Sequence, residues 1–201
     1  IRLMKFIAIE TITEICSISL FNSDGKIDIL ETSEDFAHSK NLPLLFNKII
    51  KKNKISISSL KFVAISIGPG SYTGIKIGVN FTKGLAYSLN IPIVPVNSID
   101  SLNLSINQKG KYYIALFSHK DYIFYQEFKD GLVKSKQICD KVLKLNEYKI
   151  FGYQLSNIGK IKYNKIQPSS LNIGYYAIEN YKKLATKDYG SITSICLSKV
   201  N

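Results

Sequence analysis

Residues 62–89, FVAISIGPGSYTGIKIGVNFTKGLAYSL, carry the signals that decide the fold. The apolar run 62–67 predicts a short buried strand. Gly68-Pro69-Gly70 ends this strand in a tight turn. Either Ser71 or Thr73 can then cap a helix, because a hydroxyl oxygen accepts a hydrogen bond from a free backbone N–H. The stretch therefore predicts a strand, a glycine turn and a helix in close succession.

The predicted helix continues to about Leu89, and Gly74, Gly78 and Thr82 form a stripe of very small side chains along it. A glycine inside a helix costs roughly 1 kcal/mol relative to alanine, so the stripe indicates that something packs closely there. Three interpretations stay open at this point: packing on the helix's own sheet, contact with a helix of another chain, and a phosphate cradle at the helix N-terminus. The G-x-G-x-x-x-G spacing matches neither the P-loop nor the dinucleotide fingerprint.

The residues around this stretch predict a mixed sheet covered by helices. Three antiparallel strands come first, and a helix, the strand and helix above, a further strand and a further helix follow. The predicted elements are strands at 5–9, 15–21 and 26–31, a helix at 41–52, a strand at 93–96 and a helix at 99–106. This βββ-α-β-α-β-α order is the ribonuclease-H-like order that actin-like ATPases share.

The second half of the chain repeats this order in a shorter form. The predicted elements are strands at 112–117, 122–128 and 132–136, a helix at 139–146, a strand at 149–152 and a helix at 170–184. We therefore predict an α/β protein with two βββαβα-type subdomains, residues 4–110 and a reduced subdomain at 111–201. Residues 186–201 are interpreted as a mobile or loosely docked tail.

The charge of the chain invites a nucleic-acid hypothesis, because its 201 residues include 27 basic and 15 acidic side chains, a net charge of +12. Arg2 is the sole arginine, and arginine is the residue favoured for bidentate phosphate and base contacts. The lysines are spread along the sequence, so we interpret the charge mainly as a solvated surface that weakly favours RNA or an acidic partner.

The remaining composition predicts a reduced, cytoplasmic chain without membrane contact. Cys16, Cys139 and Cys196 form no CxxC pair, and the two histidines, His38 and His119, offer no metal-ligand spacing. No apolar stretch approaches the ~18 residues that a membrane-spanning helix needs. Met4 is the one methionine, so residues 1–3 are interpreted as upstream read-in.

Two local groups could carry chemistry. Glu10 and Glu14 flank the first turn, which in actin-like ATPases lies over phosphates, and we prefer to interpret it here as a solvated hairpin tip. His38 precedes the helix at 41–52 and could act as a general base, although a capping role is the preferred hypothesis.

Several of these segments together resemble a known family. The run 66–78, SIGPGSYTGIKIG, is similar to the signature of the TsaB (YeaZ) family of bacterial tRNA threonylcarbamoyladenosine biosynthesis proteins. The segments at 83–86, 91–92 and 96–98 keep that family's pattern, and so do Ile9-Glu10-Thr11 and His38-Ser39. The resemblance covers residues 4 to about 105.

The resemblance implies an actin-like fold and a subunit that performs no catalysis alone. Family members pair with a TsaD-type subunit, which carries the metal and the transfer chemistry, and a TsaE-type ATPase joins them. Together they transfer a threonylcarbamoyl group to an adenosine next to the tRNA anticodon. We expect no cofactor on this chain, with ATP and metal on its partners, and a homodimer when the TsaD-type subunit is missing.

The pairing surface in the family is a helical bundle built from the first two helices. The resemblance therefore assigns the partner contact to these helices in this chain. The predicted partner-binding residues are Ile75, Gly78, Val79, Thr82, Ala86, Leu42, Leu45, Phe46 and Ile49. Gly68, Gly70, Ser71 and Gly74 are predicted to form either a close-packing turn or a vestigial phosphate loop.

The chain departs from the family pattern in its predicted cleft. Glu10 replaces an aspartate, Ile12 a small hydroxyl residue and Lys76 an arginine, while Phe117 and His119 stand where an aspartate and an arginine are common. These changes remove polar groups. The alternative functions are a self-sufficient nucleotide hydrolase or peptidase, and an RNA-binding module.

Overall fold

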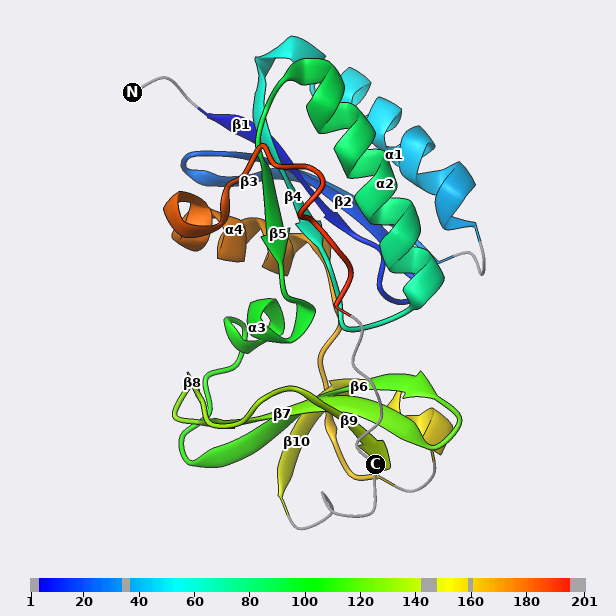
Figure 1. Cartoon of the computed structure of the whole chain (residues 1–201), viewed down its shortest axis with the longest axis vertical. Coiled ribbons are helices and arrows are strands. Elements are labelled where there is room, and N and C mark those ends of the chain that lie inside the picture. Colours follow the sequence, from blue (N-terminus) through cyan, green and yellow to red (C-terminus); the bar gives the residue numbers. More distant parts are fainter. Residues whose placement is uncertain (1–3, 34–36, 142–147, 159–160, 196–201) are drawn as a thin grey trace.

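The computed structural model describes residues 4–33, 37–141, 148–158 and 161–195 (Figure 1). Its first sheet has five strands in the order β3-β2-β1-β4-β5, with β4 and β5 parallel to β1 and the other pairs antiparallel. The strands are β1 (Lys5–Glu10), β2 (Cys16–Asn22), β3 (Gly25–Thr32), β4 (Leu60–Ser66) and β5 (Ile93–Val96). The helices are α1 (His38–Lys52), α2 (Tyr72–Leu89) and α3 (Ser98–Asn103), with a short 3-10 helix, η1 (Ile57–Ser59). The predicted ribonuclease-H-like order is confirmed.

Local signals explain the bounds of α2. The Ser71 hydroxyl accepts a hydrogen bond from the Gly74 N–H at 3.3 Å and caps the helix. At the other end Asn90 takes the left-handed conformation, with φ 52°, and its N–H closes the last turn. Both features agree with the prediction from residues 62–89.

The two faces of the first sheet form two different cores. Side chains alternate between the faces along each strand, so Ile7 and Ile9 pack under α1 and α2 while Phe6 and Ala8 face the other side. That other side is covered by α4 (Ser170–Leu184), whose Ile173 belongs to the core with Phe6. Figure 1 shows α1 and α2 on one face of the sheet and α4 on the other.

The position of α4 corrects the predicted domain division at 4–110 and 111–201. This helix was assigned to the second subdomain because it follows the second set of strands, but it packs on β1, β2, β4 and β5 of the first sheet. The chain thus returns to the first subdomain for its last helix. The physical reason is the aromatic face of the first sheet, where Phe6, Phe21 and Phe62 need a cover.

The second sheet has the order β11-β10-β6-β7-β8, with β9 also paired to β7. Its strands are β6 (Lys111–His119), β7 (Tyr122–Lys129), β8 (Leu132–Val133), β9 (Ile138–Lys141), β10 (Lys149–Tyr153) and β11 (Asn164–Lys165), and a 3-10 helix, η3 (Leu155–Ile158), follows β10. The helix predicted at 139–146 is wrong for residues 139–141, because Cys139 pairs with Phe124 in the sheet. Residues 142–146 lie outside the described residues.

The segment after α4 is docked rather than loose. Thr186 exchanges two backbone hydrogen bonds with Ile93, both at 2.9 Å, along the edge of β5. Ile192 is 4% exposed, and the Ile195 N–H donates to the carbonyl of Ile67 at 2.8 Å. Of the two interpretations of this tail, mobile or loosely docked, the mobile one is wrong for residues 186–195. Residues 196–201 lie outside the described part of the chain.

Candidate functional site

The glycine stripe of α2 faces its own sheet. A Cβ atom on Gly74 would lie 1.9 Å from the carbonyl oxygen of Thr11, and one on Gly78 would lie 2.4 Å from the Thr11 hydroxyl. The Thr11 hydroxyl also donates a hydrogen bond to the carbonyl of Gly74 at 2.8 Å. The stripe is therefore small because the turn after β1 crosses the helix there, which supports the first of the three interpretations.

This burial corrects the predicted partner surface. Thr82 and Ala86 are 0% exposed, Ile75 2% and Val79 5%, so these side chains cannot meet another chain in the folded subunit. Leu42, Phe46 and Ile49 of α1 are buried in the same core, Gly78 is buried, and Leu45 is half-buried. The sequence correctly identified the stripe of small residues on α2, but this stripe packs against the subunit's own core.

The turn at Gly68-Pro69-Gly70 is closed by its own chain. A Cβ on Gly70 would lie 2.5 Å from the Cβ of Ile12, and the Ser71 N–H donates to the carbonyl of Ile12 at 2.8 Å. Gly68 lies beside the carbonyl of Ile195, which would be 3.4 Å from an added Cβ. These contacts support the close-packing interpretation, because the first turn of the chain occupies the side of Gly70 and Gly74 on which a Cβ atom would lie.

The acidic turn is not a solvated tip, so that interpretation is wrong. Glu10 is 1% exposed, and its carboxylate accepts a hydrogen bond from the Ile12 N–H at 2.8 Å. Burial raises the pKa of Glu10 to about 7, because the charged form loses its hydration, although the hydrogen bond from Ile12 opposes the change. Glu14 accepts a hydrogen bond from the Tyr153 hydroxyl at 2.7 Å and thereby joins the two subdomains.

His38 does not cap α1, which corrects the preferred hypothesis for this residue. The cap position belongs to Ala37, and the His38 Nε2 donates to the carbonyl of Thr13 at 2.6 Å. Its Nδ1 is buried without a hydrogen-bond partner among the described residues. His38 therefore ties the first turn of α1 to the turn after β1.

A polar pocket of about 350 Å³ lies where the first sheet meets the second subdomain. Its lining includes Glu14, Glu31 and Tyr153. Glu31 accepts hydrogen bonds from the hydroxyls of Ser17, at 2.7 Å, and Ser169, at 2.8 Å. The carboxylates of Glu14 and Glu31 thus form hydrogen bonds that stabilise the fold. Within the described residues, no group of three or more His, Cys, Asp or Glu side chains could hold a metal ion.

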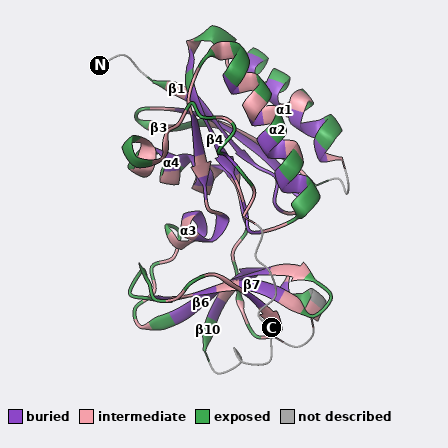
Figure 2. Ribbon diagram, viewed as in Figure 1, coloured by how far each residue is buried: buried purple, intermediate pink, exposed green. Residues whose placement is uncertain are grey.

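The outer face of α1 and α2 is the side that looks away from the sheet, where Figure 2 shows exposed residues along both helices. Leu44 is 56% exposed and Tyr87 is 76% exposed, while Ile77 is half-buried and Phe81 is half-buried against the core. Gly84 lies on this face, and an added Cβ would meet no atom within 4 Å. With 3.6 residues per turn, Gly84 lies about 120° around the helix from Gly78.

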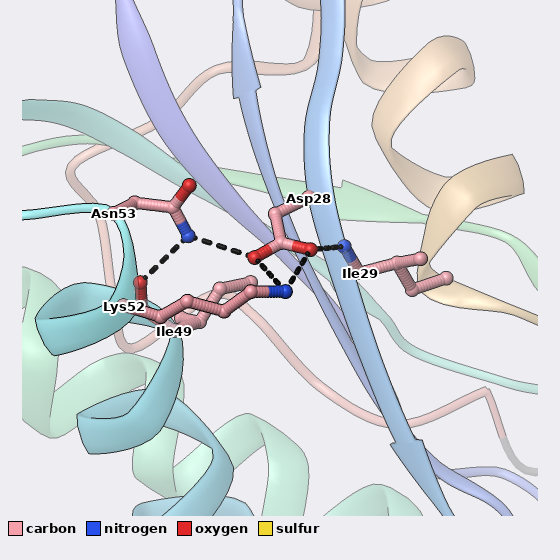
Figure 3. Close-up of polar contacts among 5 residues, drawn as sticks. All are labelled: Asp28, Ile29, Ile49, Lys52 and Asn53. Atoms are coloured by element: carbon pink, nitrogen blue, oxygen red, sulfur yellow. Dashed lines mark hydrogen bonds and ion pairs between the residues drawn. The ribbon is translucent and has the colours of Figure 1, made fainter.

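The end of α1 is fixed to the edge of the sheet, which holds this outer face in place. Asp28 of β3 accepts hydrogen bonds from Lys52 and from the Asn53 side chain, each at 2.9 Å (Figure 3). The Asn53 side chain also donates to the carbonyl of Ile49 at 2.9 Å and so closes the last turn. The pKa of Asp28 is lowered, chiefly by the hydrogen bond from Lys52.

The outer face was missed in the sequence analysis, although a signal for it was present. Gly84 is a third helix glycine that does not lie on the stripe of Gly74 and Gly78. A glycine costs stability wherever it stands in a helix, so its position outside the packed stripe indicates a second demand for close approach. The sequence shows the two glycine faces but not which of them the sheet covers.

Comparison with known proteins gives a family match over most of the chain. The family model described as "TsaD: tRNA N6-adenosine threonylcarbamoyltransferase" matches residues 33–179. A Haemophilus influenzae protein named "tRNA threonylcarbamoyladenosine biosynthesis protein TsaB" is 26% identical over 99 residues, which are 49% of this chain and 42% of that protein. A protein of the same name from Buchnera aphidicola subsp. Schizaphis graminum is 27% identical over 156 residues, 70% of this chain and 74% of that one. The match thus spans less than half of the Haemophilus relative.

Solved structures agree on the fold. A Pseudomonas aeruginosa protein described as having similarity to peptidase YEAZ superposes with a TM-score of 0.81 at 15% identity, covering 97% of this chain and 100% of its own. A polyphosphate/ATP-glucomannokinase from Arthrobacter superposes with a TM-score of 0.51 at 9% identity over 90% of this chain and 99% of its own. Separately, none of the helices in the described residues is long and apolar enough to cross a membrane.

Proposed function

Because the chain belongs to the family that the TsaD model describes, and within it to the TsaB (YeaZ) proteins, we propose that it is an accessory subunit in tRNA threonylcarbamoyladenosine biosynthesis. In this role it binds and activates a TsaD-type threonylcarbamoyltransferase and performs no transfer itself. ATP and metal belong to the TsaD-type and TsaE-type partners, and tRNA is the substrate of the assembly. Without its partner the chain pairs with a second copy through the same surface.

The observation that carries the proposal is Gly84 on the outer face of α1 and α2. Gly74 and Gly78 are explained by contacts with Thr11, but the space around Gly84 is open. An exposed glycine in a helix lowers stability by roughly 1 kcal/mol relative to alanine. No contact within the described part of the subunit requires a glycine at this position. A partner helix crossing at Gly84 would use the missing side chain to approach the α2 backbone closely.

The outer face of α1 and α2 also carries side chains that are suited to such a contact. Leu44 and Tyr87 expose large apolar surfaces, and Phe81 is half-buried and stacks edge-on against Phe46 with ring centroids 5.7 Å apart. Aromatic and aliphatic side chains around a small central residue are typical of the core of a protein interface. The ion pair between Lys52 and Asp28 fixes the end of α1 to β3 and so helps to hold the outer face in place.

The absence of a role in catalysis is supported by the closed glycine turn. Ile12 fills the space at Gly70, and the backbone of Thr11 fills the space at Gly74. The turn after β1 is itself held in this position by hydrogen bonds that involve Thr11, Ser71 and His38. Calorimetry of the isolated chain with ATP and magnesium should accordingly give no tight binding; tight binding would favour the hydrolase alternative.

The test compares two substitutions at Gly84. Gly84→Ala should raise the free energy of unfolding by up to about 1 kcal/mol and should weaken the complex only slightly. Gly84→Leu should leave the subunit folded, because its side chain enters open space, but should abolish co-elution with the TsaD-type subunit in size-exclusion chromatography. Glu179→Leu, on the exposed face of α4, serves as the matched control and should keep the complex. A complex that survives Gly84→Leu unchanged would show that the outer face is not the docking surface.

A further inference from the structure

A lysine cluster gathers at one end of the second sheet. We define it as Lys109, Lys111, Lys129 and Lys134, all of which are exposed. These residues come from separate segments of the chain that the sheet brings together: Lys111 lies directly opposite Lys129, and Lys134 follows the β8 strand, which pairs with β7. The sequence alone suggested evenly spread lysines, so this cluster is a product of the fold.

Backbone contacts hold the cluster in place. Asp130 donates its N–H to the carbonyl of Gly110 at 3.2 Å, and its carboxylate accepts the Gly110 N–H at 2.7 Å, which fixes the 109–111 segment beside the β7–β8 turn. The Lys134 N–H donates to the carbonyl of Glu127 at 2.9 Å. Hydrogen bonds therefore fix the segments that carry Lys109, Lys111 and Lys134 to the β7–β8 hairpin.

The charges of the cluster are poorly balanced. Lys111 pairs with Glu127 at 2.9 Å, but Lys109, Lys129 and Lys134 have no ion-pair partner among the described residues. Two like charges directly opposite each other on neighbouring strands destabilise a sheet. The pair Lys111 and Lys129 is such a case, and the fold retains it. A local conflict of this kind is expected where a surface serves binding.

We propose that the lysine cluster binds the phosphate backbone of RNA. Residues 111–165 contain eleven lysines against five acidic residues, so the second subdomain carries a large share of the positive charge. Lysine is a compact charge that suits the contact with a backbone irrespective of sequence, and the near absence of arginine agrees with positioning rather than base readout. Exposed Tyr148, with the Lys111 ammonium 4.5 Å from its ring centre, adds an aromatic surface beside the cluster.

The cluster lies far from the outer face of α1 and α2, as Figure 1 shows from the positions of β8 and of these helices. One chain could thus hold a protein partner on its first subdomain and a tRNA on its second. The choice of tRNA rests on the proposed function, whereas the affinity for an RNA backbone rests on the cluster alone.

The test uses the full chain and an unmodified tRNA transcript, with fluorescence anisotropy measured at several potassium chloride concentrations. The triple variant Lys109→Gln, Lys129→Gln and Lys134→Gln should bind at least tenfold more weakly near 0.1 M salt. A plot of log affinity against log salt concentration has a negative slope. The magnitude of this slope should fall by about 2 to 3, because each lost phosphate contact removes about 0.9. The control triple Lys26→Gln, Lys61→Gln and Lys182→Gln removes the same charge from exposed sites elsewhere and should change the affinity less than threefold.

Thermal unfolding of both triple variants should match the wild type, since the substituted lysines are exposed. Equal losses of affinity in the two triple variants, or no salt-dependent binding by the wild type, would overturn the proposal. Loss of binding to a TsaD-type or TsaE-type subunit with intact tRNA binding would assign the cluster to an acidic protein instead. Failure of the docking proposal would appear separately, as a complex that is insensitive to Gly84→Leu.

Discussion

At the scale of single residues, the glycines of α2 lie in two different environments, one packed and one open. Gly74 and Gly78 are needed because the turn after β1 leaves no room for a Cβ atom. Gly84, on the other side of α2, has open space. The sequence could predict that small residues matter in this helix. It could not tell which glycines serve the fold and which face solvent, because that depends on the path of residues 11–12.

Glu10 should make the stability of the protein depend on pH. Its pKa rises from an ordinary value of 4.5 to about 7 in the folded chain, so between these values the folded state keeps a proton that the unfolded state releases. Stability is therefore favoured below pH 4.5 and is lost as the pH rises through 7. Glu10→Gln keeps an acceptor for the Ile12 N–H and removes the buried charge.

We expect Glu10→Gln to raise the free energy of unfolding by about 3 kcal/mol at pH 8 and to change it little at pH 4.5. The measurement is urea unfolding of the wild type and of Glu10→Gln at a series of pH values. The contributions of the other titrating groups largely cancel in the difference between their free energies of unfolding. A difference between the two proteins that does not vary with pH would contradict the raised pKa.

At the scale of elements, the sequence predicted the helices and strands that are determined by their own residues. It failed for elements whose structure depends on a pairing or packing partner elsewhere in the chain. Ser71 and Asn90 mark both ends of α2, an apolar run marks β1, and partial alternation marks β2. The segment around Cys139 has helix-compatible spacing, and only its pairing with Phe124 makes it a strand. The range of α4 was predicted correctly, but its packing partner was not.

The packing of α4 predicts that residues 4–110 do not fold alone. Without this helix, Phe6, Phe21 and Phe62 would be exposed on the back of the first sheet, and two of the ring pairs stack with centroids 5.0 and 4.1 Å apart. We expect a fragment of residues 4–110 to aggregate or to show no near-ultraviolet circular dichroism. Co-expression with a segment of residues 166–195 should restore a soluble, cooperatively unfolding complex.

The control for this rescue is Gly174→Leu in the added segment. A Cβ at Gly174 would lie 2.1 Å from the Phe21 ring, so the variant segment should fail to dock. Cooperative unfolding of the 4–110 fragment by itself would show that the first sheet does not depend on α4.

At the scale of the whole molecule, several polar side chains bridge the two subdomains, and two of these bridges can each be removed by one substitution. The amides of Asn97 and Gln137 exchange hydrogen bonds of 3.0 and 2.8 Å between the start of α3 and the second sheet. Glu14 accepts from the Tyr153 hydroxyl on the other subdomain. In a protein whose cleft opens and closes on a ligand, such contacts would have to break in each cycle. Here they join the two subdomains, which agrees with the proposed function, in which the subunit positions its partners.

These bridges predict a measurable gain in motion when both are removed. Gln137→Ala deletes one amide, while Asn97 still caps α3 through the Ile99 N–H, and Tyr153→Phe deletes the donor to Glu14. The double variant should lose about 2 to 4 kcal/mol of stability, because one of the bonds involves a carboxylate. Its radius of gyration in small-angle X-ray scattering should increase. Tyr125→Phe, at a half-buried tyrosine of β7 whose ring packs edge-on against Tyr113, is the control and should change neither quantity. A double variant that scatters like the wild type would mean that α3, α4 and the chain connections alone fix the subdomains, and that the polar bridges follow their orientation rather than set it.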